Sequence, residues 1–184
     1  VVMGLLNMQG RESDDSRLQS IIEQSRMRIR AIMLIHEKLY NTASFSRVSF
    51  QGYMRELTRM LHGFHKESAA AVTIEVTGDE VMMGIDQAMP CALIVNELVT
   101  NALKYAFSGK GGAINVSISR TGGNFELTVC DNGVGFDASA LAEDKGLGHK
   151  LVDILARQLD GEARFERSNG ARWIIRFPIS GEST

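Results

Sequence analysis

Three short motifs constrain this chain most, because each combines polar or glycine residues with the end of a predicted helix or strand. They are residues 96–105 (NELVTNALKY), 131–136 (DNGVGF) and 146–148 (GLG). The first lies in a helix that is apolar on most sides, and the second follows a strand of buried residue types. The third opens a predicted helix, where free backbone amides and the helix dipole favour an anion. In this order they predict a nucleotide pocket.

The composition is that of a chain with one hydrophobic core. Of the 184 residues, 44% are apolar and 23% are charged, and the net charge is −2. A nucleic-acid surface would need more basic residues, and no apolar run approaches the roughly 20 residues of a membrane span. Cys91 and Cys130 lie in apolar stretches and are expected to be reduced core residues of a cytoplasmic protein. The chain begins with Val1 inside an apolar pattern, which indicates a fragment of a longer protein.

Residues 1–44 predict a helical hairpin with its turn near residues 13–15. Its second helix repeats at steps of three and four, the pattern of a helix that packs on other helices: Leu18, Ile22, Ser25, Ile29, Ile32, His36 and Leu39. Two helices alone bury little apolar surface, so we expect the hairpin to dimerise into a four-helix bundle. The alternative is a hairpin that folds onto its own C-terminal domain.

Residues 45–181 predict an α/β sandwich with a mostly antiparallel sheet and helices on one face, which makes the whole chain α+β. Ser49 is expected to cap one helix, and Asp86 to cap another that runs to about Phe107. A helix is also expected over residues 146–159. Alternating apolar residues and glycine turns predict strands over residues 72–77, 114–118, 125–129, about 165 and 173–177.

Four polar side chains in the helix of residues 96–105 recur at steps of three and four and therefore share one face: Glu97, Asn101, Lys104 and Tyr105. A helix that is otherwise buried should not carry them without partners. A divalent cation with its phosphates would supply such partners, because Asn101 offers Mg²⁺ an oxygen and Lys104 offers phosphate a positive charge. Glu97 is the candidate proton acceptor. A row of salt bridges on the helix surface is the alternative.

The two glycine motifs predict the rest of the pocket. Asp131 ends a buried strand, where its carboxylate would accept a hydrogen bond from the exocyclic amine of adenine; an ordinary Asp-Asn-Gly turn is the alternative. Residues 136–145 form a polar connector of the length of a lid. Lys145 at its end is expected to reach a phosphate or to be a solvated charge, and His149 to touch phosphate or solvent.

Residues 96–105 resemble the N box, 131–136 the G1 box and 146–148 the G2 box of sensor histidine kinases, whose ATP-binding fold is shared with gyrase, Hsp90 and MutL. The resemblance implies that Asn101 binds Mg²⁺, that Asp131 holds adenine, and that Glu97 is a general base, as in the gyrase branch. The expected contacts to ATP come from ten residues: Asn101, Lys104, Tyr105, Asp131, Gly133, Gly135, Lys145, Gly146, Leu147 and Gly148.

Residues 1–40 resemble the dimerisation hairpin of the kinase subfamily whose phosphoacceptor motif reads His-Arg-x-Lys-Asn-Asn-Leu-Gln. That motif would end just before Val1, so the phosphorylatable histidine is expected about eight residues upstream, outside this chain. His36 falls on the helical seam, which favours a buried and hydrogen-bonded histidine. With a turn near residue 14, the hairpin would bring His36 and Glu37 beside the missing acceptor, and we hypothesise that they help to position it.

The sequence therefore predicts the core of a cytoplasmic, homodimeric two-component histidine kinase. It would bind ATP and Mg²⁺ and transfer the γ-phosphoryl to a histidine of the bundle, with Glu97 and Lys104 as catalytic residues. The phosphoryl would then pass to an aspartate of a response regulator that docks on the hairpin. One alternative is a degenerate kinase that acts as a phosphatase or docking module. Another is an ATPase or serine kinase of the same fold, such as an anti-sigma factor.

Overall fold

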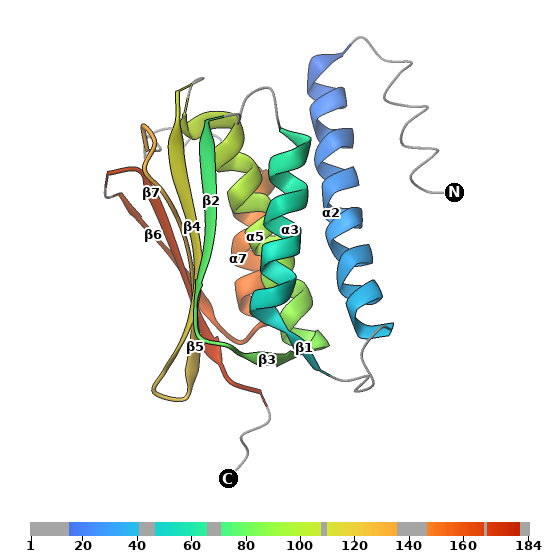
Figure 1. Cartoon of the computed structure of the whole chain (residues 1–184), viewed down its shortest axis with the longest axis vertical. Coiled ribbons are helices and arrows are strands. Elements are labelled where there is room, and N and C mark those ends of the chain that lie inside the picture. Colours follow the sequence, from blue (N-terminus) through green and yellow to red (C-terminus); the bar gives the residue numbers. More distant parts are fainter. Residues whose placement is uncertain are drawn as a thin grey trace.

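The structure is a computed structural model that describes residues 15–40, 47–65, 71–107, 110–135, 147–167 and 169–180. Within these ranges, helices cover one face of a mixed, mostly antiparallel sheet, and a further helix lies outside them, on the side away from the sheet (Figure 1). The predicted α+β class is confirmed. None of the described helices is long and apolar enough to cross a membrane.

Among the described residues, five strands form the main sheet, in the order β2-β4-β5-β7-β6. Their bounds are Val72–Gly78 (β2), Gly112–Thr121 (β4), Asn124–Asp131 (β5), Glu162–Arg167 (β6) and Ala171–Pro178 (β7). All pairings are antiparallel except that of β2 with β4. This exception follows from the chain path, because a helix crosses over between β2 and β4, and a crossover connects parallel strands. Two short strands, β1 (Arg47–Ser49) and β3 (Met82–Gly84), pair with each other instead of extending this sheet.

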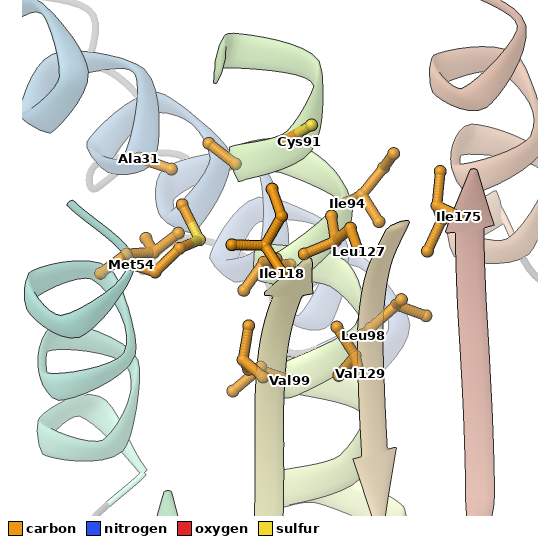
Figure 2. Packing of buried hydrophobic residues seen from close by; sticks show 14 of the residues in the cluster. Ala31, Met54, Cys91, Ile94, Leu98, Val99, Ile118, Leu127, Val129 and Ile175 are labelled. Atoms are coloured by element: carbon orange, nitrogen blue, oxygen red, sulfur yellow. The ribbon is translucent and has the colours of Figure 1, made fainter. Parts of the chain in front are cut away.

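In the part of the chain that the structure describes, three helices pack on the sheet: α3 (Phe50–Phe64), α5 (Ile85–Asn101) and α7 (Leu147–Gln158). The central one, α5, is buried on most of its surface, as its apolar sequence predicts. Figure 2 shows Ile94 and Leu98 of α5 among the side chains of β5 and β7. This packing fixes α5 against the strand that ends in Asp131.

The N-terminus of α3 is capped as the sequence predicts, whereas that of α5 is not. The hydroxyl of Ser49 accepts a hydrogen bond from the Gly52 amide at 3.3 Å, so the predicted cap of α3 is confirmed. The predicted cap of α5 is wrong, because the helix begins after Gly84 and Asp86 lies in its first turn. A carboxylate in that position still interacts favourably with the helix dipole.

The outer helix, α2 (Ser16–Tyr40), packs on α5 and α3 through one of its faces. Met27, Ala31 and Ile35 of this helix are buried in the same core as the sheet. The second helix of the predicted hairpin therefore contacts its own C-terminal domain, the arrangement that the sequence left as an alternative. Residues 1–14, which include the predicted first helix, lie outside the described residues, and the four-helix bundle stays a prediction.

The docking of α2 is tested by truncating one isoleucine on each of its faces. Ile35 is 0% exposed and Ile21 is 46% exposed. We expect Ile35→Ala to lower the free energy of unfolding by about 3 kcal/mol, because it leaves a cavity in the core. The control Ile21→Ala should change it by less than about 0.5 kcal/mol. Urea unfolding measures both, and equal losses would contradict this packing of α2.

Candidate nucleotide site

The C-terminal end of α5 continues into a turn of π-helix, η1 (Ala102–Ala106). Such turns are rare and occur frequently at functional sites. Asn101 stands at the junction of α5 and η1, and Tyr105 is 57% exposed within the turn. The carbonyl oxygen of Ala106 accepts a hydrogen bond from the Val134 amide at 2.9 Å. The residue that follows the predicted N box is thus joined to the predicted G1 box through the backbone.

Asp131 is the last residue of β5, and two backbone amides hold its carboxylate. Its Oδ1 atom accepts hydrogen bonds from Gly133 at 3.0 Å and from Ala171 at 3.3 Å. A side chain at Gly133 would place Cβ 2.3 Å from the Ala106 carbonyl oxygen, so only glycine allows this close approach. Within the described part of the chain, Oδ2 of Asp131 accepts no hydrogen bond. The carboxylate is therefore fixed in orientation and offers one oxygen to a ligand.

A pocket of about 520 Å³, its opening to solvent included, lies between α5, η1, β5, β7 and α7. Its lining is mostly apolar, with Asn101 and Asp131 among the few polar groups: Leu98, Asn101, Ala102, Tyr105, Ala106, Val129, Asp131, Gly135, His149, Ala171 and Trp173. An apolar slot with a fixed carboxylate is suited to a flat heterocycle that carries an amine.

Sequence reasoning missed the wall of this pocket that β7 supplies, and it expected His149 of α7 to touch phosphate or solvent instead of lying against that wall. Trp173 pairs with Val129 in the sheet, and its ring centre lies 5.3 Å from that of His149 at a tilt of 32°. His149 is half-buried beside this ring, so the structure places it at the end of the pocket that Trp173 forms. The sequence signal for these residues was weak, because only the pairing of β5 with β7 brings Trp173 to Asp131.

Gly170, in the turn between β6 and β7, is a second residue that the sequence did not single out as part of the site. Its φ is +132°, and a Cβ atom there would lie 2.0 Å from the carbonyl oxygen of Asp131. Gly135 has a φ of +72° and faces the same turn, with a Cβ position 3.3 Å from the Gly170 oxygen. These glycines allow the turn to close over the end of β5.

The predicted polar face of α5 and η1 divides between two environments. Asn101 and Tyr105 line the pocket, whereas Glu97 and Lys104 form ion pairs with α2. Arg28 donates from Nε to Glu97 Oε1 at 2.6 Å and from Nη2 to Oε2 at 2.9 Å. Lys104 Nζ lies 3.5 Å from Glu23 Oε2. The helix α2 runs in the opposite direction to α5 and η1. Its earlier residue, Glu23, pairs with the later residue Lys104, whereas Arg28 pairs with Glu97.

The Glu97 side chain is only 5% exposed, and Arg28 satisfies both of its oxygens. The hydrogen bond to Glu97 raises the pKa of Arg28 above its ordinary value and outweighs the opposite effect of burial. Asn96 adds a hydrogen bond at 3.3 Å to Glu97 Oε1. The carboxylate is therefore held in place as an ion pair, as a buried charge requires.

The first turn of α7 lies directly against the two N-box side chains. A Cβ atom at Gly148 would be 3.3 Å from Asn101 Nδ2 and 3.3 Å from Glu97 Oε2. Leu147 is the first residue of α7, while Lys145 and Gly146 lie outside the described residues. Glycine thus lets the first turn of α7 approach the Asn101 amide and the Glu97 carboxylate closely. Helix amides suit phosphate, and the Asn101 side chain, whose nitrogen faces Gly148 here, also carries an oxygen that suits Mg²⁺, so these residues fit the ligands that the sequence predicts.

Comparison with known proteins identifies the family. The family model described as histidine kinase-, DNA gyrase B- and HSP90-like ATPase matches residues 86–181, and a model described as histidine kinase matches residues 1–65. The first match spans more than half of the chain. The chain therefore belongs to the histidine kinase-, DNA gyrase B- and HSP90-like ATPase family, and its N-terminal third matches that of histidine kinases.

Individual relatives agree with this assignment. Sensor histidine kinase PdtaS of Mycobacterium tuberculosis is 23% identical over 184 residues, which are 97% of this chain and 36% of that protein. Blue-light-activated histidine kinase 2 of Erythrobacter litoralis is 25% identical over 165 residues, 85% of this chain and 47% of that protein. The chain thus spans between a third and a half of the length of these relatives.

A solved structure shows the same fold. The histidine kinase domain of the Erythrobacter litoralis EL346 blue-light activated histidine kinase matches with a TM-score of 0.75 at 21% identity. The match covers 97% of this chain and 92% of that chain. It extends over α2 as well as over the C-terminal domain.

The dependence of the pocket on Gly170 is testable by comparison with another glycine of positive φ. Gly170→Ala would drive Cβ into the Asp131 backbone, whereas Gly123, with φ +78°, has open space around it. Both alanines strain the backbone, so we expect Gly170→Ala to cost at least about 1 kcal/mol more than Gly123→Ala. Urea unfolding compares them. Equal costs would show that Gly170 does not pack on Asp131.

Proposed function

We propose that the chain binds ATP with Mg²⁺ and acts as the catalytic core of a histidine kinase in a two-component system. The single observation that supports this most is the pocket in which the fixed carboxylate of Asp131 faces apolar walls, next to Asn101. Family membership supports ATP as the ligand. The N-terminal match to histidine kinases favours a kinase over an ATPase or an anti-sigma factor.

In this proposal adenine lies between the apolar walls of the pocket and donates its exocyclic amine to Asp131 Oδ2. The phosphates extend past Asn101 toward the first turn of α7, where backbone amides and the helix dipole attract them. Asn101 would hold Mg²⁺, which neutralises phosphate charge when it is bound. Gly135 and Tyr105 border the nucleoside in this proposal, while Leu147 and Gly148 border the phosphates. Lys145 and Gly146 lie outside the described residues, and their binding of phosphate stays an expectation from the sequence.

Two residues on the α2 side of α5 and η1 are proposed to take part in the chemistry. Lys104 binds a phosphate oxygen in exchange for its ion pair with Glu23, which is long at 3.5 Å. Glu97 is the general base that accepts the proton of the attacking group. The chain's contribution is thus mostly positioning and charge neutralisation, as in other phosphoryl transfers.

The face of α2 that points away from the domain is the proposed surface for a second copy and for a response regulator. Leu18, Ile21 and Met33 are exposed on this helix. His36 and Glu37 are exposed as well, so the buried histidine expected from the helical seam is not found within the single chain. We propose that residues 1–44 form the dimerisation hairpin, with His36 and Glu37 near the phosphoacceptor, and that residues 45–181 form the ATP-binding domain.

The role of Asp131 is tested by Asp131→Asn. Asparagine keeps an oxygen for the amides of Gly133 and Ala171 but replaces the other oxygen with a donor, which would face the adenine amine. We expect ATP affinity to fall by roughly 10- to 100-fold, the effect of losing a hydrogen bond to a charged group. The matched control is Asp160→Asn at an exposed position with φ +54°, which asparagine tolerates. Isothermal titration with ATP and Mg²⁺ measures both, and unchanged affinity in Asp131→Asn would contradict the adenine assignment.

The reaction class is tested by the chemistry of the phosphorylated product. Because the phosphoacceptor histidine is expected upstream of Val1, the experiment mixes this chain with a longer version of the protein that reaches past the missing motif. With γ-labelled ATP, the longer version is expected to take up label that is lost in acid. A serine kinase of the same fold gives a phosphate ester that survives acid, and an ATPase gives only free phosphate. Either of these results would contradict the proposed phosphoryl transfer.

A further inference from the structure

The ion pair between Arg28 and Glu97 joins α2 to the start of the predicted N box. Both hydrogen bonds of the guanidinium go to this carboxylate, at 2.6 and 2.9 Å, and the two side chains are 21% and 5% exposed. A two-point pair of this kind is strong and directional. It is also costly to break from one side, because removal of Arg28 would leave a buried charge on Glu97.

This pair lies beside the place where the phosphates of a nucleotide would bind. Glu97 Oε2 and Asn101 Nδ2 are both 3.3 Å from the Cβ position of Gly148, at the first turn of α7. The same Oε2 atom accepts the 2.9 Å hydrogen bond from Arg28 Nη2. Arg28 is therefore separated from the phosphate end of the site by a single carboxylate, although it belongs to a helix outside the C-terminal domain.

The negative charge of Glu97 affects how well the site can bind phosphates. A buried carboxylate at the first turn of α7 would repel the phosphates that the helix amides attract. The repulsion would act through a partly buried region, where charges are screened less than in water. Arg28 offsets the charge of Glu97, so the phosphate end of the site is not made negative by its own general base.

We propose that Arg28, supplied by α2, is a positioning and specificity residue of the nucleotide site. By pairing with Glu97, it orients this carboxylate and neutralises it, so that the site accepts the phosphate chain of ATP. The inference rests on the proposed function and extends it, because α2 then contributes to nucleotide affinity and is not only a support for phosphotransfer. A nucleoside without phosphates would contact only the pocket around Asp131, so its affinity should not depend on Arg28.

The second ion pair between the same elements fits this proposal. Lys104 and Glu23 are 3.5 Å apart, and the Glu23 side chain is 40% exposed. A pair of this kind is weak, so Lys104 can leave Glu23 for a phosphate oxygen. The shorter Arg28–Glu97 pair would meanwhile keep α2 on the domain.

The test compares the affinities of ATP and adenosine in the wild-type chain and in Arg28→Ala. Isothermal titration in the presence of Mg²⁺ measures both ligands. We expect Arg28→Ala to weaken ATP binding by about ten-fold and to leave adenosine binding within about two-fold. The matched control is Arg30→Ala, on the same helix, whose guanidinium lies 4.4 Å from the centre of the Phe64 ring of α3. This control should change neither affinity.

A second substitution separates charge neutralisation from a merely structural role. If Arg28 acts by offsetting Glu97, then Glu97→Gln in the Arg28→Ala background removes the repelling charge, and most of the lost ATP affinity should return. Failure of this rescue would overturn the proposal. So would tighter ATP binding in Arg28→Ala, which would make α2 an obstacle to the nucleotide, or equal losses for ATP and adenosine, which would indicate general damage to the fold.

The same titrations distinguish this proposal from the function on which it rests. If the wild-type chain binds neither adenosine nor ATP, the nucleotide function itself is wrong and the role of Arg28 is wrong with it. If the wild type binds both and Arg28→Ala binds both as tightly, the nucleotide function stands and only the role of Arg28 is contradicted.

Discussion

The burial of α5 is the constraint on which the rest of the structure depends. This helix lies on the sheet, with α3, α7 and α2 around it, so almost every residue that it carries must find a partner inside the protein. Its apolar residues do so by packing on β5 and β7 (Figure 2). Glu97 does so by pairing with Arg28, because an unpaired buried carboxylate would be strongly destabilising. The need to satisfy one charge therefore ties α2 to the domain.

The same helix divides the site into two parts with different physical character. On the sheet side, the turn after β5 and the wall formed by β7 enclose an apolar pocket with a rigid carboxylate. On the α2 side, charged residues dominate, and they are already paired within the chain. Asn101 stands between the parts, beside the first turn of α7. A ligand with a flat apolar end and a charged end matches this division, which is the physical basis for proposing a nucleotide.

Local patterns predicted most of the fold. The strands followed from alternation, the β4–β5 hairpin from Gly122 and Gly123, and the start of α3 from Ser49. The order of strands and the position of α2 did not follow, because both depend on contacts between residues far apart in the sequence. The exposed face of α2 carries apolar residues too, so its sequence alone did not decide which face would meet the domain.

The site was predictable to a similar degree. Asn101, Tyr105, Asp131 and Gly135 lie around the pocket, since each belongs to a short motif whose geometry is local. Trp173, Ala171 and Gly170 come from a hairpin about 40 residues after Asp131, and only the register of β5 with β7 brings them there. The pairing of Glu97 and Lys104 with α2 was missed for the same reason, as helical spacing shows which residues share a face but not what covers it.

The fluorescence of Trp173 tests the central claim most directly, because it is the single tryptophan of the chain and it lines the pocket. Titration with ATP and Mg²⁺ should give a saturable change in its emission, since a bound adenine would lie against the indole ring. GTP should give a much smaller change at the same concentrations, because guanine presents a carbonyl oxygen where adenine presents its amine to Asp131. No change with ATP, or equal changes with both nucleotides, would contradict an adenine pocket between β5, β7 and α5.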